Sequence, residues 1–325
     1  MAVDVKSPRG PMYRIIDGFT GNRYFSTELF RSALRYVPRK DDTFLVTFPK
    51  SGTIWMQQIT YLILHDGFPA PSGLEFYRSS PFLEMVGAED VVRMRQPGVI
   101  KTHLYYDLAP KSPTAKYVWV CRNPKDVCVS FFYHTKAFTA YDFTDGKFED
   151  FFEVFMEGAN DFGDYFDYIL SWYAHRNDPN VFLMHFEELK ADPKSQMLKL
   201  AAFLGEEYHR KLTQEPEVLE RVVKFSGIDY MKEKTADTIK AFFANALESD
   251  EEVCPGIRHY LEATVKYPRN ASFIRKGVLG DWKNHFTPDM NSRMEKKIYE
   301  KLSGTEFIDL WKKHAILSSR ESNVA

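Results

Sequence analysis

The sequence predicts a single α/β domain in which a mainly parallel central sheet is flanked by helices. Three segments share one pattern, a short apolar strand followed by a tight turn and an amphipathic helix, and they begin at Thr43, Tyr117 and Val181. Strands that alternate with helices pair in parallel, and the helices then cover both faces of the sheet. Since no internal repeat or long linker divides the chain, we expect one domain over all 325 residues, with mobile tails at about 1–18 and 316–325.

The first strand is expected over Thr43–Phe48 (TFLVTF), a β-branched and aromatic run of strand length. Pro49 and Gly52 end it, and apolar residues then recur at helical spacing, namely Trp55, Ile59, Leu62 and Ile63. The loop between this strand and this helix is therefore expected where open α/β sheets bind ligands.

The other two units follow the same order. The strand Tyr117–Cys121 (YVWVC) leads into Asn123-Pro124, a helix N-cap followed by proline at the first helical position. The strand Val181–Met184 is followed by Asp192-Pro193, which begins a helix that Gly205 ends. Two further helical regions are expected, one or two helices within Phe148–His175 and a last helix that Thr287-Pro288 begins and that stops near Gly304.

The composition excludes several functional classes. The 43 Lys and Arg against 45 Asp and Glu give a formal charge of −2, which argues against a dedicated nucleic-acid-binding protein. No window of about 18 apolar residues could span a membrane, and the opening residues lack the apolar segment of a secretory signal. Cys121, Cys128 and Cys254 have no metal-ligand spacing and favour a reducing compartment. We expect a cytoplasmic protein without a bound metal and with neither nucleic acid nor membrane as its partner.

The segment Thr47–Trp55 (TFPKSGTIW) has the features of an anion-binding loop. Gly52 lets the backbone approach an anion closely, the helix N-terminus offers unpaired N–H groups, and Lys50 adds a full positive charge. The pattern GxxxxGK[ST] of triphosphate-binding loops is absent, so a phosphate or sulfate cradle of another kind is predicted. Taken alone, the segment also fits an ordinary solvated turn.

A second candidate loop lies in Arg275–Thr287 (RKGVLGDWKNHFT), where two cationic side chains directly precede Gly277. Such a loop can surround a phosphate with guanidinium, ammonium and backbone donors. Taken alone, it equally fits an exposed basic turn that ends in a buried Trp282.

Together, TFPKSGTIW and RKGVLGDWKNHFT closely resemble the two signature regions of the cytosolic sulfotransferases. KTHL at Lys101–Leu104 and CRNPKDVCVSFF at Cys121–Phe132 lie between them in the order of that family, and the resemblance spans roughly residues 40 to 290. It implies a single α/β domain that moves the sulfuryl group of 3′-phosphoadenosine-5′-phosphosulfate (PAPS) to a hydroxyl or amine of a small acceptor. Adenosine 3′,5′-bisphosphate (PAP) would be the second product.

The resemblance also assigns the donor site, with a P-loop-like first loop around the phosphosulfate. That loop would bind with Lys50, Ser51, Gly52, Thr53 and the backbone of Ile54. The residues around the 3′-phosphate would be Arg122, Ser130, Arg275, Lys276 and Gly277, and those around adenine Trp55, Phe186 and Ser226. Three cations around one phosphate explain how a nearly neutral protein selects a bisphosphorylated nucleotide.

His103 matches the catalytic base of the family. Neutral imidazole, with an ordinary pKa near ~6.5, takes the acceptor proton as the acceptor atom attacks sulfur in line. Lys50 would stabilise negative charge on the departing phosphate oxygen, and Lys101 and Ser130 would position the donor. No metal is expected, because the transferred sulfuryl group carries less negative charge than a phosphoryl group and lysines are already placed for the leaving oxygen.

Several positions depart from the pattern of the family. Ile54 stands where threonine is common, Phe186 where tyrosine is usual, Ser226 where threonine is common, and Ile228 at a usual aromatic position. None of these differences removes a charge, so they predict weaker donor binding rather than its loss.

The dimer motif of the family, KxxxTVxxxE, would begin at Lys283 and reach Thr287. Pro288 replaces its valine and Ser292 its glutamate, which argues against that particular homodimer. The proline instead fits the start of a helix.

The chain is longer than typical members between about 232 and 274, with an acidic stretch at Glu248–Glu252. Two interpretations stay open for this extension, a lid over the acceptor and a solvated surface insertion.

Aromatic residues are dense where the resemblance places the acceptor, and they suggest a phenol, an amine of the catecholamine kind or a sterol. These residues are Phe19, Phe25, Phe76, Phe82 and Phe131–Tyr133.

Two other functional classes remain open. A nucleotide kinase would share the strand, loop and helix but would bind ATP with magnesium. A catalytically silent binding protein would keep the fold without turnover, and replacement of His103 would matter little to it.

Overall fold

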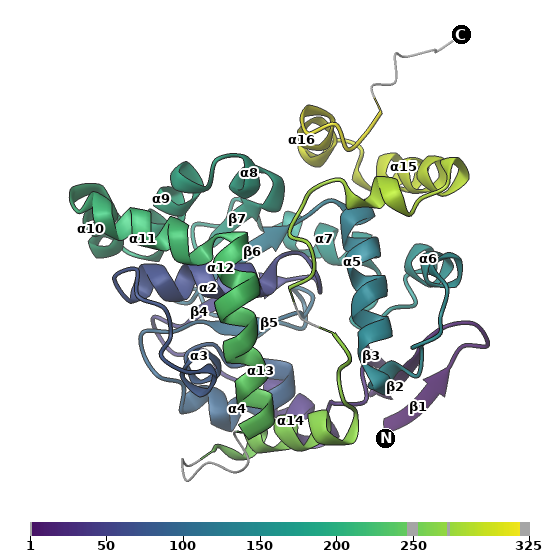
Figure 1. Cartoon of the computed structure of the whole chain (residues 1–325), viewed down its shortest axis with the longest axis horizontal. Helices are drawn as coiled ribbons and strands as arrows, with labels where there is room; N and C mark the ends of the chain where they lie inside the picture. Colours follow the sequence, from purple (N-terminus) through teal and green to yellow (C-terminus); the bar gives the residue numbers. More distant parts are fainter. Residues whose placement is uncertain (1, 246–252, 272–273, 319–325) are drawn as a thin grey trace.

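The computed structural model describes residues 2–245, 253–271 and 274–318. Its central sheet has four parallel strands in the order β5-β4-β6-β7 (Figure 1). The strands are β4 (Thr43–Thr47), β5 (Ile100–Thr102), β6 (Lys116–Cys121) and β7 (Val181–His185). Leu45 of β4 lies opposite Val118 of β6, which in turn lies opposite Phe182 of β7. The parallel sheet predicted from the three strand and helix units is confirmed, and each predicted strand end agrees within one residue.

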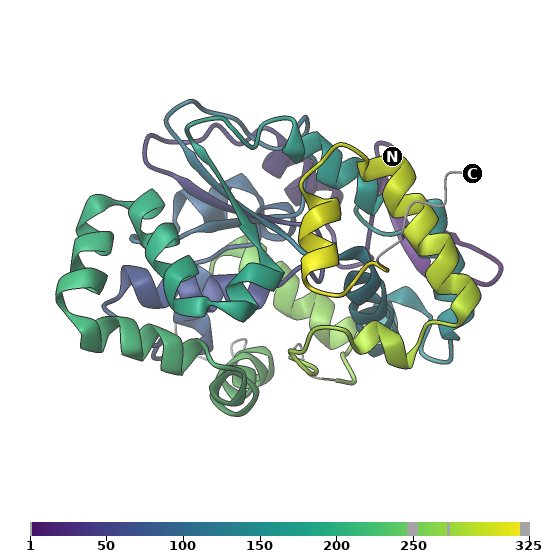
Figure 2. The same cartoon turned by 90° about the horizontal axis from the view of Figure 1, so that it is seen from above.

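Side chains alternate between the two faces of the sheet, as strand geometry requires. In β4, Leu45 packs into one apolar cluster, while Phe44 and Val46 pack into the other. Helices α2 (Thr53–Leu64), α9 (Pro193–Leu204), α10 (Glu206–Gln214) and α11 (Pro216–Ser226) cover the first face. Helices α1 (Thr27–Leu34), α4 (Leu83–Val92), α5 (Pro124–Ala137), α6 (Phe148–Glu157) and α7 (Tyr165–Tyr173) contribute to the second (Figure 2).

The predicted helix starts are confirmed by their caps. The side chain of Asn123 accepts a hydrogen bond from the backbone N–H of Asp126 at the start of α5, and Asp192 and Thr287 cap α9 and α15 (Pro288–Leu302) in the same way. The aromatic region 148–175 forms two helices, α6 and α7. The remaining short elements are α3 (Gly73–Arg78), η1 (Thr139–Tyr141), α8 (Phe186–Ala191), α12 (Ile228–Tyr230), η2 (Met231–Thr235), η3 (Asp281–Asn284) and α16 (Phe307–Lys313).

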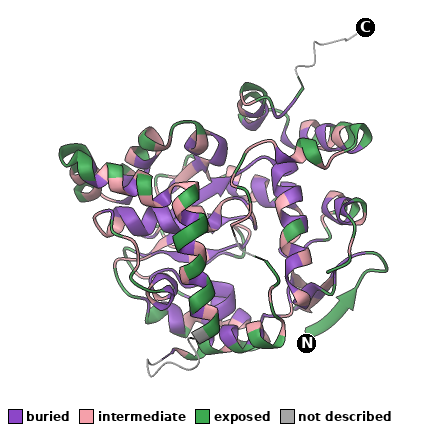
Figure 3. Ribbon diagram, viewed as in Figure 1, coloured by how far each residue is buried: buried purple, intermediate pink, exposed green. Residues whose placement is uncertain are grey.

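The first residues of the chain differ from the expected tail. They form an antiparallel sheet of β1 (Ala2–Lys6), β2 (Met12–Ile16) and β3 (Phe19–Gly21). Strand β1 is exposed along its length (Figure 3), but Ile16 is fully buried, so β2 is tied to the core. The reason is long-range packing, which the local sequence does not reveal.

The end of the described chain is also anchored. The Nζ of Lys125 donates one hydrogen bond of 2.7 Å to Oε1 of Glu295 and another of 2.7 Å to the carbonyl oxygen of Ile316. Ile316 and Leu317 are buried. Of the tail expected at 316–325, residues 319–325 lie outside the described residues.

The extension forms two helices, α13 (Ala236–Asn245) and α14 (Pro255–Lys266), which pack against α3 and α4. Phe242 stacks on Tyr77 with ring centroids 4.5 Å apart, so α13 buries an apolar side chain. The acidic stretch 248–252 lies outside the described residues. No helix in the described part of the chain is long and apolar enough to cross a membrane.

Candidate active site

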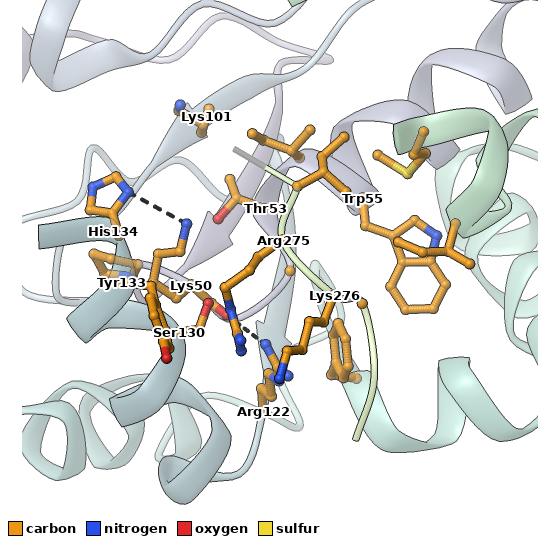
Figure 4. A pocket seen from close by; sticks show the side chains of 18 of the residues that line it. Lys50, Thr53, Trp55, Lys101, Arg122, Ser130, Tyr133, His134, Arg275 and Lys276 are labelled. Atoms are coloured by element: carbon orange, nitrogen blue, oxygen red, sulfur yellow. Dashed lines mark hydrogen bonds between the residues drawn. The ribbon is translucent and has the colours of Figure 1, made fainter. Parts of the chain in front are cut away.

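A cavity of 630 Å³ lies at the carboxyl ends of all four parallel strands. Lys50 follows β4, His103 follows β5, Arg122 follows β6 and Phe186 begins the helix after β7, and all four line the cavity. This edge of an open parallel sheet is where ligands bind in α/β folds. Segments far away in sequence complete it, among them the loop around 275–278 (Figure 4).

The structure brings together nearly all of the site residues predicted from the sequence. The predicted residues that line the cavity are Lys50, Gly52, Thr53, Ile54, Trp55, Lys101, His103, Arg122, Ser130, Phe186, Ser226, Arg275, Lys276 and Gly277. Ser51 is fully buried at its edge, and its Oγ finds no hydrogen-bond partner within the described part of the chain. A buried hydroxyl of this kind needs a partner, and a bound anion would supply one.

The loop before α2 has the geometry of an anion cradle. Gly52 has a φ of 107°, and a Cβ built there would lie 2.8 Å from Cδ2 of Phe186, so only glycine fits. Lys50 also has a positive φ, 70°, which is strained for a residue with a side chain. The first turn of α2, described in full, contains no acidic side chain that would compete for its N–H groups.

Lys50 reaches across the cavity to α5. Its Nζ lies 3.5 Å from Nδ1 of His134 (Figure 4). Burial, followed by the charges of Arg269, Arg122 and Arg275, lowers the pKa of Lys50 from its ordinary value to about 7. An anion bound next to Lys50 would raise its pKa again and so favour the positively charged form of this lysine.

His103 has a fixed tautomer. Its Nδ1 lies 2.6 Å from the carbonyl oxygen of Thr47, which only accepts, so Nδ1 carries the proton and the lone pair is on Nε2. Burial and then the charges of Lys101 and Lys50 hold the pKa of His103 well below its ordinary value, so the imidazole is neutral at pH 7. A neutral imidazole with one available nitrogen can accept a proton.

Glu84 of α4 holds the backbone around His103. Its Oε1 accepts a hydrogen bond of 2.5 Å from the N–H of His103 and one of 3.0 Å from Oγ1 of Thr102. Burial raises the pKa of Glu84 to about 7. No local pattern in the sequence points to Glu84, because it lies in a different element from the motif that it supports.

Three cations meet at the other end of the cavity. In Figure 4 the charged ends of Arg122, Arg275 and Lys276 point into the same part of it. Gly277 has a φ of 66°, and a Cβ there would lie 2.2 Å from Cδ1 of Ile228, so this position also requires glycine. The Nε of Arg122 has no hydrogen-bond partner among the described residues. These features suit a phosphate bound by several donors.

Two aspartates order this loop, and sequence reasoning missed both. Asp126 accepts hydrogen bonds from the N–H groups of Gly280 (2.9 Å) and Trp282 (3.3 Å), which ties the late loop to the start of α5. Asp281 pairs with Arg275 at 2.6 Å and with Lys276 at 2.7 Å. Although burial opposes it, the hydrogen bonds from Lys276 and the other partners hold the pKa of Asp281 below its ordinary value.

A third part of the cavity is flat and aromatic. The indole Nε1 of Trp55 donates a hydrogen bond of 2.9 Å to the carbonyl oxygen of Ser226, and its ring meets Phe186 edge to face with centroids 5.2 Å apart. Ile228, the departure from an aromatic position, also lines the cavity. An apolar slot of this kind suits a nucleobase.

The aromatic residues expected around the acceptor divide into two groups. Phe82 and Tyr133 line the cavity, whereas Phe19, Phe25, Phe76, Phe131 and Phe132 pack in or against the core. Sequence reasoning missed the residues that form the rest of this wall, which are Tyr24, His134, Phe138, Phe162, Tyr260 and Arg269. Tyr260 and Arg269 come from the extension, so part of the extension forms the cavity wall rather than a detached surface insertion.

Comparisons with known proteins agree with this geometry. Residues 40–306 match the family described as the sulfotransferase domain. The chain is 32% identical over 278 residues to the amine sulfotransferase of Oryctolagus cuniculus, with 84% of each chain covered. It is 30% identical over 268 residues to sulfotransferase 1E1 of Homo sapiens, with 79% of this chain and 82% of the relative covered.

Solved structures agree as well. The crystal structure of mouse sulfotransferase SULT7A1 complexed with PAP is similar with a TM-score of 0.68 and 26% identity, covering 93% of this chain and 98% of that one. The fold is also that of retinol dehydratase in a complex with retinol and PAP, with a TM-score of 0.66, 22% identity and 92% of each chain covered.

Proposed function

The chain belongs to the sulfotransferase family and is a sulfotransferase; we propose that it uses PAPS to sulfate a hydroxyl or amine of a small aromatic acceptor. The observation that carries this proposal is the neutral imidazole of His103, with its proton fixed on Nδ1, in one cavity with Lys50 and a glycine-rich anion loop. PAPS, when bound, supplies the sulfuryl group, so that the bond from sulfur to the acceptor forms, the bond from sulfur to the 5′-phosphate oxygen breaks, and PAP leaves.

Under this proposal, different residues of the cavity carry out proton transfer, charge stabilisation and donor binding. His103 takes the acceptor proton on Nε2, and the carbonyl of Thr47 stabilises the resulting imidazolium through Nδ1. Lys50 stabilises negative charge on the leaving oxygen, with Lys101 and Ser130 as positioning residues. The loop 50–54 binds the 5′ end of the donor.

The nucleotide itself is bound at two places under this proposal. Arg122, Arg275, Lys276 and the backbone of Gly277 bind the 3′-phosphate together with Ser130, and the three cations line this part of the cavity. Adenine lies against Trp55, Phe186 and Ser226.

Binding of PAP is expected to raise the thermal stability of the protein more than ATP with magnesium does. A ligand at a hundred times its Kd adds about 2.7 kcal/mol to the free energy of unfolding. The three cations and the loop 50–54 are arranged for two separate phosphate groups, which ATP does not present. Differential scanning fluorimetry with PAP, ATP plus magnesium, and adenosine checks this. A shift with ATP alone would contradict the donor assignment and favour a kinase.

Turnover is expected to survive chelation, because lysines rather than a metal are placed to stabilise the leaving oxygen. Initial rates with PAPS and a phenol, measured before and after EDTA treatment, test this, with a magnesium-dependent kinase treated in parallel as the control. Loss of activity that magnesium restores would show that a metal takes part.

We also propose a cytoplasmic protein whose partners are its nucleotide and its small acceptor. The helix N-cap of Thr287 and the position of Pro288 at the start of α15 support the view that the family dimer motif serves a local structural purpose here.

A further inference from the structure

One sign of charge lines the cavity. Among the described lining residues, none is Asp or Glu, while seven are Lys or Arg, namely Lys50, Lys101, Arg122, Lys190, Arg269, Arg275 and Lys276. A cleft lined by one sign of charge concentrates ligands of the opposite sign. Under the proposed function the donor accounts for most of these cations but gives no role to Lys190 or Arg269. Lys190 lies beside the expected adenine site, 5.7 Å from the ring centroid of Trp55, whereas Arg269 lies beside a different group of rings.

Arg269 belongs to the aromatic wall next to His134. Its guanidinium lies 4.6 Å from the ring centroid of Phe138, whose ring in turn lies 4.5 Å from His134 and 5.3 Å from Tyr24. Tyr260 lines the same wall, 6.1 Å from Tyr24 between ring centroids. This wall, formed by Tyr24, Phe138, Tyr260 and Arg269, is called the acceptor wall below.

The segment that carries Arg269 is fixed by backbone hydrogen bonds. The N–H of Asn270 donates to the carbonyl oxygen of Ala137 at 2.8 Å, and the N–H of Thr139 donates to that of Pro268 at 3.2 Å. Between these bonds, Phe138 and Arg269 form an isolated antiparallel bridge. The backbone bonds fix the start of the side chain, and the guanidinium packs against the ring of Phe138, so Arg269 loses less conformational entropy when a ligand binds than a fully solvated arginine would.

Among the described residues, two buried carboxylates lie behind the cavity lining rather than in it. Asp161 accepts a hydrogen bond of 2.5 Å from the hydroxyl of Tyr141, and Glu84 accepts from the N–H of His103. Burial raises the pKa of each to about 7, which weakens their negative charge at neutral pH. Burial lowers the pKa of Arg269 only to about 10, so its guanidinium stays charged.

We propose that Arg269 binds a negatively charged group of the acceptor, so that the preferred substrates are aromatic alcohols carrying a carboxylate or a similar anion. A guanidinium in a fixed place forms charge-assisted, often paired hydrogen bonds with such a group. A protonated amine would face several like charges in the same cavity and has no lining carboxylate, among the described residues, to bind it. The inference rests on the proposed function and narrows its acceptor class.

Three acceptors of similar size test this inference: 3-(4-hydroxyphenyl)propanoate, 4-propylphenol and tyramine. The experiment measures kcat/KM of each acceptor with PAPS at saturation. We expect the value for the acid to be about tenfold higher than the value for 4-propylphenol, and the value for tyramine to be about tenfold lower than it. The readout is the ratio of kcat/KM for acid to neutral phenol, so a loss common to all acceptors cancels.

Variants of Arg269 test whether this side chain causes the preference for the acid. Arg269→Met is expected to lower the acid-to-neutral ratio about tenfold, Arg269→Lys to restore part of it, and the control Lys266→Met, a nearby exposed cation, to leave it unchanged. A rise in melting temperature with PAP verifies that each variant folds. Wild-type enzyme that sulfates 4-propylphenol without preferring the acid would overturn this inference alone, as would an unchanged ratio in Arg269→Met. Failure of both PAP binding and turnover would instead overturn the proposed function.

Discussion

Replacement of His103 by alanine is expected to lower kcat/KM about a thousandfold while PAP binding persists. The fixed proton on Nδ1 leaves Nε2 as the nitrogen that accepts the acceptor proton, and alanine removes it. Since burial and the charges of Lys101 and Lys50 keep the pKa of His103 below its ordinary value, kcat/KM should stay level as the pH falls to about 6.5 and decline only below it. Steady-state rates between pH 5 and 8 measure both effects.

A matched control is His209→Ala, which removes a histidine outside the cavity. It should leave the rates unchanged. Retention of turnover in His103→Ala, with PAP binding intact, would exclude this residue as the base. A catalytically silent binding protein would show no turnover in either variant or in the wild type.

Lys50→Met is expected to lower kcat by a factor on the order of a hundred to a thousand, because the leaving oxygen loses its nearest cationic donor. Lys50→Arg keeps the charge and should recover part of the rate. Both variants should also lose the pH dependence of PAP binding that the titration of Lys50 gives the wild type, which provides a second measurement independent of turnover.

The sign of that pH dependence follows from the lowered pKa of Lys50. Without nucleotide the pKa is about 7, and phosphate groups raise it by stabilising the charged form. Below pH 7 the lysine is charged in both states and the affinity for PAP is level. Above pH 7 binding takes up a proton, so the affinity falls by about tenfold per pH unit until the pKa of the complex is reached.

Isothermal titration calorimetry in two buffers of different ionisation enthalpy measures this proton uptake. Burial lowers the pKa of Lys101 to about 8, so a second, separate decline is expected there. Lys50→Arg should abolish the decline that starts near pH 7 and keep the one near pH 8. A wild-type affinity that does not change between pH 6 and 9 would contradict the assignment of Lys50 to the donor phosphates.

The central sheet and the donor loops could be predicted because their signals are local. The strand Thr43–Thr47, the turn at Gly52 and the cap at Asn123 each express their structure within a few residues of sequence. Parallel strands end at the same edge of a sheet, so the residues that follow them, Lys50, His103 and Arg122, come to one edge whatever the strand order.

The acceptor wall and the first sheet could not be predicted in this way. Arg269 reaches the cavity because its backbone pairs with Phe138, which lies 131 residues earlier in the sequence. The residues Pro268–Asn270 show no local pattern that would predict this pairing. The first strands are ordered because Ile16 is buried in a core made by distant residues. Glu84 was missed for the same reason, since it supports His103 from another helix. Asp126 and Asp281 lie within the motifs, but their contacts depend on how the loop after Arg275 folds onto the start of α5, which the local pattern does not reveal.

The ion pairs of Asp281 have a kinetic consequence. Arg275 and Lys276 rest against this carboxylate, so under the proposed function the 3′-phosphate would replace one anionic partner with another. Under the proposed function this competition would reduce the affinity for the bisphosphate product, because both cations keep an anionic partner after it departs. Product release limits turnover in many enzymes that close around their ligands. Asp281 would thus allow the enzyme to bind a multiply charged nucleotide selectively and still release it between cycles.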